Sequence, residues 1–266
     1  MNQRDIIKIA DQFYNSRICG AKVEPFPEEL RLVDTRDVNL VIEEVTSRLL
    51  RNNIEEIAGW KIGFLYKPRQ EPVICPIFKS KLFESPASIP ISMAPSLRIE
   101  PEISFRLKND LPKRERLYTP QEVSQSLLAS ASLEIIDTRF DTSRRSIREM
   151  IDNPLTKLEA LADHNTCGAF VTSKGCDNWQ NLDFASMIMK MSSPKGIIVQ
   201  SNGGHAFLDP FLPCVVLANV MRKKCGLKKD DVLVTGSFSG FYQVESGSEI
   251  TAEFLGLGQA KATFVQ

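Results

Sequence analysis

The clearest pattern in the chain is the alternation of apolar and polar residues over residues 98–107. The apolar positions recur with a period of two, which predicts a β-strand with one apolar face. These positions are Ile99, Ile103, Phe105 and Leu107. Glu100 and Glu102 fall together on the opposite face. Pro101 cannot donate a ladder hydrogen bond, so this part of the strand is predicted to lie at an edge or a bulge, and bulges are common beside active sites.

A third carboxylate follows in a second strand-like run, residues 132–139. Glu134 lies there between Leu133 and two isoleucines, and acidic residues are seldom buried without a partner. Together with Glu100 and Glu102 it makes a candidate set of oxygen ligands for Mg²⁺ or Mn²⁺. The alternative for the first pair is the solvated polar face of a half-exposed strand.

The first 56 residues have a helical pattern instead. Apolar residues between Asn2 and Tyr14 recur at helical spacing, with Gly20 ending the segment. Asp37 is predicted to cap a second helix, which ends at Asn52. We expect residues 1–56 to form a helical N-terminal part and residues 57–266 to form a β-rich catalytic domain, as one structural unit.

Further elements follow from local signals. Thr-Pro-Gln-Glu at residues 119–122 predicts a capping box, and the apolar stripe extends that helix to Ala131. Another helix should begin at Pro210 and end at Gly226. From Asp231 onward the pattern predicts strands and tight turns.

Composition narrows the class of protein. The chain has 266 residues, of which 42% are hydrophobic and 25% are charged, as in an ordinary globular protein. Lys+Arg and Asp+Glu both number 33, so no net charge attracts nucleic acid or an anionic membrane. No apolar run approaches the roughly 18 residues of a spanning helix, and the N-terminus lacks the apolar stretch of a signal peptide. We therefore expect a cytoplasmic protein.

The cysteine pattern also favours a cytoplasmic protein, and the histidine content argues against two kinds of catalytic site. The six cysteines are scattered without a Cys-x-x-Cys pair, which is typical of reduced thiols. The two histidines lie far apart, which leaves little material for a histidine zinc site or a Ser-His-Asp triad.

Six motifs follow one another along the chain. They are Gly59-Trp-Lys-Ile-Gly63, Arg98-Ile-Glu-Pro-Glu-Ile-Ser-Phe105, Leu133-Glu-Ile-Ile-Asp-Thr-Arg139, Leu161-Ala-Asp-His-Asn-Thr-Cys-Gly168, Asp231-Val-Leu-Val-Thr-Gly-Ser237 and Val244-Glu-Ser-Gly-Ser-Glu-Ile250. In this order they resemble the fumarylacetoacetate hydrolase superfamily, in its branch of 2-keto-4-pentenoate hydratase and 4-oxalocrotonate decarboxylase. The resemblance covers about residues 59–264.

The resemblance implies an α+β fold with a mixed β-roll or sandwich core, outer helices and a helical N-terminal part. It implies a lyase that hydrates a 2-hydroxy-2,4-dienoate, through its 2-oxo tautomer, to a 4-hydroxy-2-oxo acid. Glu100, Glu102 and Glu134 would hold Mg²⁺ or Mn²⁺. It also implies a homo-oligomer, with pairing to a related enzyme as an alternative, and a role in aromatic catabolism.

The same resemblance assigns the other site residues. Lys61 would bind the substrate carboxylate or assist proton transfer, and Thr166 would hydrogen-bond the substrate or its attacking water. His164 stands where the family has Asn, so its candidate role comes from its own chemistry: a histidine, whose usual pKa lies near neutrality, can act as a general acid or base. The residues assigned to substrate binding are Arg139, Thr235, Gly236 and Ser237. The alternatives are a surface lysine for Lys61 and a structural, hydrogen-bonded histidine for His164.

Three departures from the family pattern keep other functions open. Residues 76–82 are basic through Lys79 and Lys81 where the family has an acidic residue, and His164 and Asn165 replace Asn and Ala. Residues 140–160 are longer and more charged, which indicates an exposed helix or lid whose arginines (144, 145 and 148) meet an anionic substrate, or a solvated face. The alternatives are therefore a 2-oxo-3-enedioate decarboxylase and a partner or structural subunit without turnover.

Overall fold

The structure, a computed structural model, describes residues 1–64, 71–143 and 145–266, without the side chain of Leu155. It has an α+β fold, as expected, and divides into two compact units. Unit 1 comprises Met1–Ile57, Gly63–Pro76 and Asp137–Cys167. Unit 2 comprises Ala58–Ile62, Ile77–Ile136 and Gly168–Gln266. Unit 1 thus joins the N-terminal helices to two later stretches of chain. The expected helical part over residues 1–56 and catalytic β-rich domain over residues 57–266 stay a prediction.

Unit 1 begins with two long helices, α1 (Gln3–Cys19) and α2 (Thr35–Arg51). Gly20 ends α1 in a left-handed conformation with φ of 73°. The prediction that Asp37 caps α2 is wrong, because the side chain of Asp34 accepts the N–H of Asp37. Asp37 lies in the first helical turn, where it accepts hydrogen bonds from the amino group of Met1.

Residues 140–160 belong to unit 1, and the expectation of an exposed segment holds only in part. Ile147 and Met150 are buried, whereas Arg148 and Glu149 between them are exposed, and a lid stays a prediction. The segment forms α4 (Ile147–Asp152), and α5 (Pro154–Ala162) follows at its end; α5 packs on α2 and α4. Phe140 lies within a cluster of edge-to-face rings with Phe13 and Phe26. Of the three arginines, Arg145 pairs with Glu159, and Arg144 lies outside the described residues.

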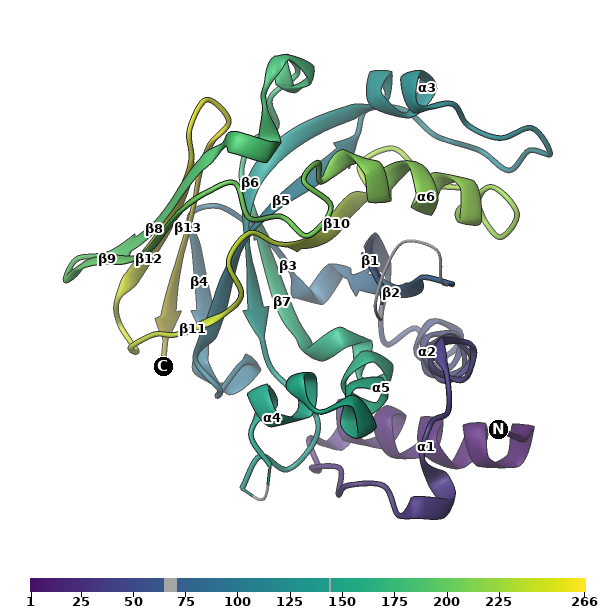
Figure 1. Ribbon diagram of the computed structural model, residues 1–266. Coiled ribbons are helices and arrows are strands. Elements are labelled where there is room, and N and C mark those ends of the chain that lie inside the picture. Colours follow the sequence, from purple (N-terminus) through teal and green to yellow (C-terminus); the bar gives the residue numbers. More distant parts are fainter. Residues whose placement is uncertain (65–70, 144) are drawn as a thin grey trace. The chain divides into compact units, whose positions relative to one another are not determined.

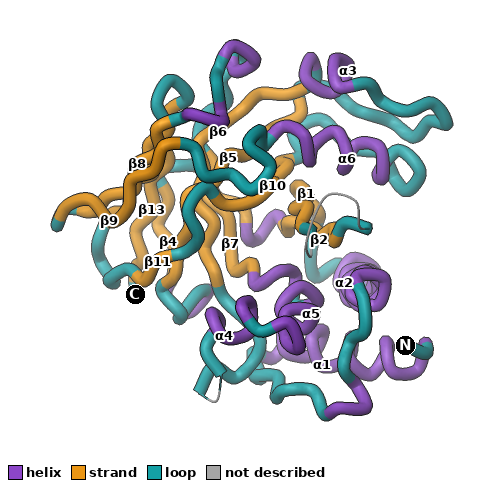
Figure 2. Tube along the Cα trace, in the orientation of Figure 1, coloured by secondary structure: helices purple, strands orange, loops and turns teal. Residues whose placement is uncertain are grey.

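Unit 2 is built around two β-sheets (Figures 1 and 2). The larger, eight-stranded sheet has the order β2-β1-β10-β5-β6-β7-β3, with the short β11 paired to β5. The strands are β1 (Ile57–Gly63), β2 (Val73–Phe78), β3 (Leu82–Glu84), β5 (Arg98–Leu107), β6 (Leu127–Ile136), β7 (Cys167–Thr172), β10 (Val232–Ser237) and β11 (Tyr242–Gln243). Strands β1, β2 and β7 contain the chain positions where the two units meet in sequence.

The second sheet has five strands in the order β4-β13-β12-β8-β9, and β12 and β13 pack on β6. Its strands are β4 (Ala87–Pro90), β8 (Ile188–Ser193), β9 (Gly196–Asn202), β12 (Glu249–Phe254) and β13 (Gly258–Val265). The apolar residues of β5 and β6 form the core, and the ring of Phe105 contacts Trp179 with centroids 5.2 Å apart. Because a strand alternates, the polar residues of β5 and β6 share the opposite face.

Two expectations about the chain around β5 and β6 need correction. Helix α3 (Pro120–Gln125) has the predicted capping box, but it ends at Ser126 and does not reach Ala131. Strand β6 begins at Leu127, because residues 127–136 pair with all of β5 and their alternation suits a strand. Helix α6 (Phe211–Met221) lies where expected, and Gly226 follows it with φ of 72°.

Pro101 lies in a central strand rather than at an edge, and the predicted bulge is in the neighbouring strand. The register of β10 against β5 shifts between Val234 and Ser237. In an antiparallel strand the N–H and C=O of one residue point to the same neighbour, so Pro101 has no donor to offer β10 there. Its carbonyl accepts the N–H of Phe238 just beyond the bulge.

Among the described residues, none of the helices has the length and apolar character of a membrane-spanning segment.

Candidate metal centre

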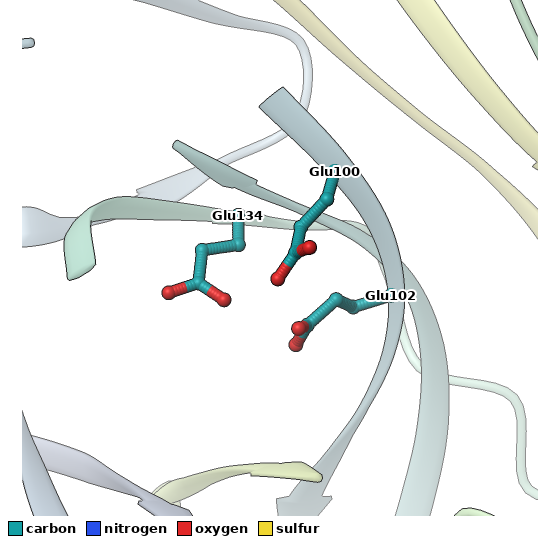
Figure 3. Close-up of side chains that lie close together, drawn as sticks. All are labelled: Glu100, Glu102 and Glu134. Atoms are coloured by element: carbon teal, nitrogen blue, oxygen red, sulfur yellow. The ribbon is translucent and has the colours of Figure 1, made fainter. Parts of the chain in front are cut away.

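Strands β5 and β6 bring the three predicted carboxylates together. Their antiparallel register sets Glu100 opposite Glu134, and Glu102 opposite Ser132. The alternation of both strands therefore points all three side chains to one face of the sheet. Figure 3 shows the carboxyl groups converging from the two strands.

The carboxylate oxygens lie close enough to share one ion. One oxygen from each of Glu100, Glu102 and Glu134 lies within 4.8 Å of the others. Oxygens around Mg²⁺ lie about 3 Å apart when adjacent and about 4 Å apart when opposed, so the three carboxylates would draw together on binding one ion. Glu102 and Glu134 are fully buried, and Glu100 is 9% exposed. The alternative of a solvated polar face is therefore wrong.

Burial raises the pKa of two carboxyl groups in this cluster. Desolvation raises the pKa of Glu102 well above its usual value; Lys61 opposes that shift, while Glu134 and Glu100 add to it. Desolvation likewise raises the pKa of Glu134 to about 7, against the lowering effect of Lys61. Without a cation, the cluster holds protons that three ordinary carboxylates would release at neutral pH.

The unused oxygens fit a hard divalent cation. Among the described residues, no donor reaches either carboxylate oxygen of Glu102 or Oε1 of Glu134. Buried acceptors without a donor are costly, and a cation with oxygen ligands would satisfy them.

Lys61 brings a positively charged side chain to the carboxylates, and the surface-lysine alternative is wrong. It is 4% exposed, and its Nζ donates to Oε2 of Glu134. Strand β1 sets Lys61 beside Val234 of β10 in parallel register. The close approach of these strands requires Gly59, since a Cβ there would lie 2.1 Å from the Val232 carbonyl oxygen. The ring of Phe170 lies 5.6 Å from the Lys61 ammonium.

The predicted substrate-binding residues of β10 lie at the bulge beside the carboxylates. Ser237 is opposite Glu102 in register, and Gly236 has φ of 122°, which a side chain rarely adopts. Thr235 is 4% exposed, and its hydroxyl has no hydrogen-bond partner among the described residues. The Ser237 hydroxyl accepts the N–H groups of Ser239 and Gly240.

The other predicted residues, Arg139, His164 and Thr166, belong to unit 1. Arg139 donates its Nε to Asp163 and its two Nη groups to the backbone carbonyls of Asp137, Asp163 and Cys167. This is a structural role, and substrate binding by Arg139 stays a prediction. Asp163 was not predicted as a site residue, although it opens the family motif; Thr138 and Arg139 both donate to it.

Residues 164–166 form a left-handed turn. His164, Asn165 and Thr166 have φ between 49° and 54°, a conformation that costs about 1–2 kcal/mol per residue. His164 is 3% exposed, and its burial lowers its pKa well below the usual value, so it is neutral at physiological pH. The Thr166 hydroxyl donates to the carbonyl of Asn165. Such strain is typical of functional sites, but the catalytic roles of His164 and Thr166 stay predictions.

The comparisons agree with the motifs. No protein-family model matches the chain. The chain is 23% identical over 272 residues to a 2-keto-4-pentenoate hydratase of Burkholderia vietnamiensis, covering 100% of this chain and 99% of the relative. It is 25% identical over 233 residues to a 2-hydroxyhexa-2,4-dienoate hydratase of Comamonas testosteroni, covering 82% of each.

Solved structures show the same fold. The 4-oxalocrotonate decarboxylase from Pseudomonas putida G7, complexed with magnesium and adipate, has a TM-score of 0.78 and 17% identity, over 99% of this chain and 98% of that one. The same enzyme was also solved with calcium and acetate. The chain therefore has the fold of the fumarylacetoacetate hydrolase superfamily, and its sequence is similar over most of its length to proteins named 2-keto-4-pentenoate hydratase.

Proposed function

We propose that this protein is a divalent-metal-dependent hydratase of a 2-hydroxy-2,4-dienoate, yielding a 4-hydroxy-2-oxo acid. The observation that carries the proposal is the convergence of Glu100, Glu102 and Glu134 beside Lys61. On this face, buried carboxylate oxygens of Glu102 and Glu134 have no donor among the described residues. The whole-length similarity to proteins named hydratases supports the substrate class.

The three glutamates would hold Mg²⁺ or Mn²⁺. When bound, such an ion would supply positive charge that stabilises an enolate of the substrate. The magnesium and calcium complexes of the structural neighbour support a divalent ion.

Lys61 would serve the substrate through its ammonium group. Lys61 is buried and donates a hydrogen bond to Glu134, one of the candidate metal ligands. Its ammonium group would therefore lie beside the carboxylate of a bound substrate. In the reaction a proton leaves the 2-hydroxyl and another reaches C5; water oxygen then bonds to C4 while a proton reaches C3. Lys61 would orient the acid group or carry one of these protons.

Residues 235–237 would complete the binding surface. Thr235 has a buried hydroxyl with no partner in the described chain, and Ser237 lies opposite Glu102. These hydroxyls would hydrogen-bond the substrate or the attacking water.

The second candidate is decarboxylation of a 2-oxo-3-enedioate. It is favoured by the TM-score of 0.78 with 4-oxalocrotonate decarboxylase over nearly the whole chain. It would use the same stabilised enolate, formed by loss of CO₂ rather than by proton transfer.

One assay separates these activities. Absorbance of 2-hydroxypenta-2,4-dienoate and of 2-oxohex-3-enedioate is followed with Mg²⁺, with Mn²⁺ and with chelator, while released CO₂ is measured. A hydratase consumes the dienoate without CO₂ and stops on chelation. If the protein binds metal but converts neither acid, it would instead be a partner or structural subunit without turnover. The homo-oligomer remains a prediction, which light scattering tests.

A further inference from the structure

His205 is a buried histidine of unit 2 to which the proposed reaction gives no task. It lies in the loop between β9 and α6 and is 3% exposed. Its Nδ1 accepts the N–H of Phe207 at 3.3 Å, and its Nε2 lies 3.2 Å from the carbonyl oxygen of Thr235. A backbone N–H can only donate, so Nδ1 carries no proton in the neutral ring. The proton is on Nε2, which donates to Thr235.

The loop before His205 is shaped to bring the ring to this place. Gly203 and Gly204 have φ of 68° and 129°. A Cβ on Gly203 would lie 2.1 Å from the Ala185 carbonyl oxygen, and one on Gly204 would lie 2.1 Å from that of Phe238. Only glycines allow this approach of backbone to backbone. His205 is therefore held against the chain that follows β10.

The acceptor of this hydrogen bond belongs to the bulge of β10. Thr235 and Gly236 are the residues between the two paired positions Val234 and Ser237. A bulge interrupts the ladder, so its polar backbone groups need partners from elsewhere. A Cβ on Gly236 would lie 3.6 Å from Nε2 of His205, so the ring also lies close to this residue.

We propose that His205 is a positioning residue: its Nε2–H holds the Thr235 carbonyl and so sets residues 235–237 opposite Glu102, where they meet a bound 2-oxo acid. The inference rests on the proposed function only in assigning these residues to the substrate. His205 itself does not touch the substrate.

The test compares His205→Phe with His205→Gln. Phenylalanine keeps the ring volume but removes both the Nε2 donor and the Nδ1 acceptor of the Phe207 N–H, whereas the glutamine amide restores a donor at nearly the reach of Nε2. Ala206→Ser, at the exposed neighbouring residue, is the control. For each protein, calorimetry gives the affinity for Mn²⁺ and, in the Mn²⁺-loaded form, for oxalate, a mimic of a chelating 2-oxo acid; the dienoate assay gives kcat and KM, and melting gives Tm.

We expect His205→Phe to weaken oxalate binding and turnover about tenfold, and His205→Gln to recover most of the loss. Mn²⁺ affinity should not change, because the glutamates are untouched. Unaltered oxalate affinity in His205→Phe overturns the inference, as does a loss that glutamine does not restore and that follows Tm. Wild type that binds no oxalate also overturns it. If oxalate shows the expected pattern while wild type turns over no dienoate, the proposed function fails and the positioning role stands.

Discussion

At the scale of single residues, chemistry here depends on what surrounds each side chain. Glu102 and the exposed Glu253 of β12 are both strand glutamates, but only Glu102 is buried without a donor among the described residues. Lys61 and Lys190 differ in the same way, because the side chain of Lys61 is 5% exposed and that of Lys190 is 41% exposed. The Lys190–Glu253 pair therefore provides matched controls for the site.

Glu102→Gln should weaken Mn²⁺ binding and nearly abolish turnover. The amide removes a ligand charge, and it also relieves repulsion in the metal-free cluster, so the metal-free variant should melt no lower than wild type. Calorimetric or relaxation titration of Mn²⁺, with melts in chelator, measures both effects; Glu253→Gln is the control. Equal Mn²⁺ affinity in Glu102→Gln and wild type would refute the metal site.

Lys61→Met should lower kcat/KM at least about tenfold while metal binding persists. A hydrogen bond to a charged group contributes roughly 1.5–3 kcal/mol, and methionine preserves the apolar stem. Removing the ammonium also removes a positive charge beside the ion, so Mn²⁺ affinity should stay or rise. Steady-state kinetics and Mn²⁺ titration of Lys61→Met measure both effects, and Lys190→Met is the control. Unchanged kinetics would mean that Lys61 serves only Glu134.

At the scale of secondary-structure elements, strand pairing and burial decided the structure of two segments more than their local sequence pattern did. Residues 127–131 carry an apolar stripe that suits a helix or a strand, and the full register with β5 made them a strand. Residues 140–160 contain dense charge, yet Phe140, Ile147 and Met150 are buried. A few apolar side chains therefore attach this segment to the core of unit 1, while its charged residues Arg148 and Glu149 stay exposed.

Ile147→Ala should therefore destabilise the protein by about 2–5 kcal/mol, because it removes a fully buried side chain from α4 and leaves a cavity. Asp152→Ala, at an exposed position of the same helix, should change stability by less than about 0.5 kcal/mol. Denaturant unfolding measures both free energies. If Ile147→Ala were as mild as Asp152→Ala, the segment would be a cover after all.

At the scale of the whole molecule, the carboxylate cluster links stability, pH and metal. Glu134 changes from a pKa of 4.5 to about 7 on folding, and the pKa of Glu102 is also raised. A raised carboxylate pKa destabilises the folded state once the group must ionise. For the metal-free protein, this contribution is absent below the unfolded pKa of Glu134 and grows as pH rises through its folded pKa.

Stabilisation by Mg²⁺ or Mn²⁺ should therefore increase between about pH 5 and about pH 8, because the ion binds the ionised ligands and displaces protons. Melts with metal and with chelator across this range give the difference in Tm. Glu134→Gln removes one titrating ligand and should flatten the curve. A metal-induced shift in Tm that is equal at both ends of the range would contradict the linkage.

The sequence by itself determined the elements whose signals are local and the residues whose chemistry is rare in its place. Alternation predicted β5, and the Thr119 capping box predicted the start of α3. A glutamate among Leu and Ile marked Glu134 as unusual. Local signals suffice here because backbone propensity, capping and alternation act over a few neighbouring residues.

Only the tertiary structure decided which of these residues meet. The register of β5 with β6 converted two separate strands into one carboxylate cluster, and the pairing of β1 with β10 buried Lys61 beside it. The sequence could not place the bulge in β10 rather than at Pro101, nor link His205 to Thr235, 30 residues away. Such contacts join positions distant in the chain, and their free energy depends on packing and burial that no short window contains.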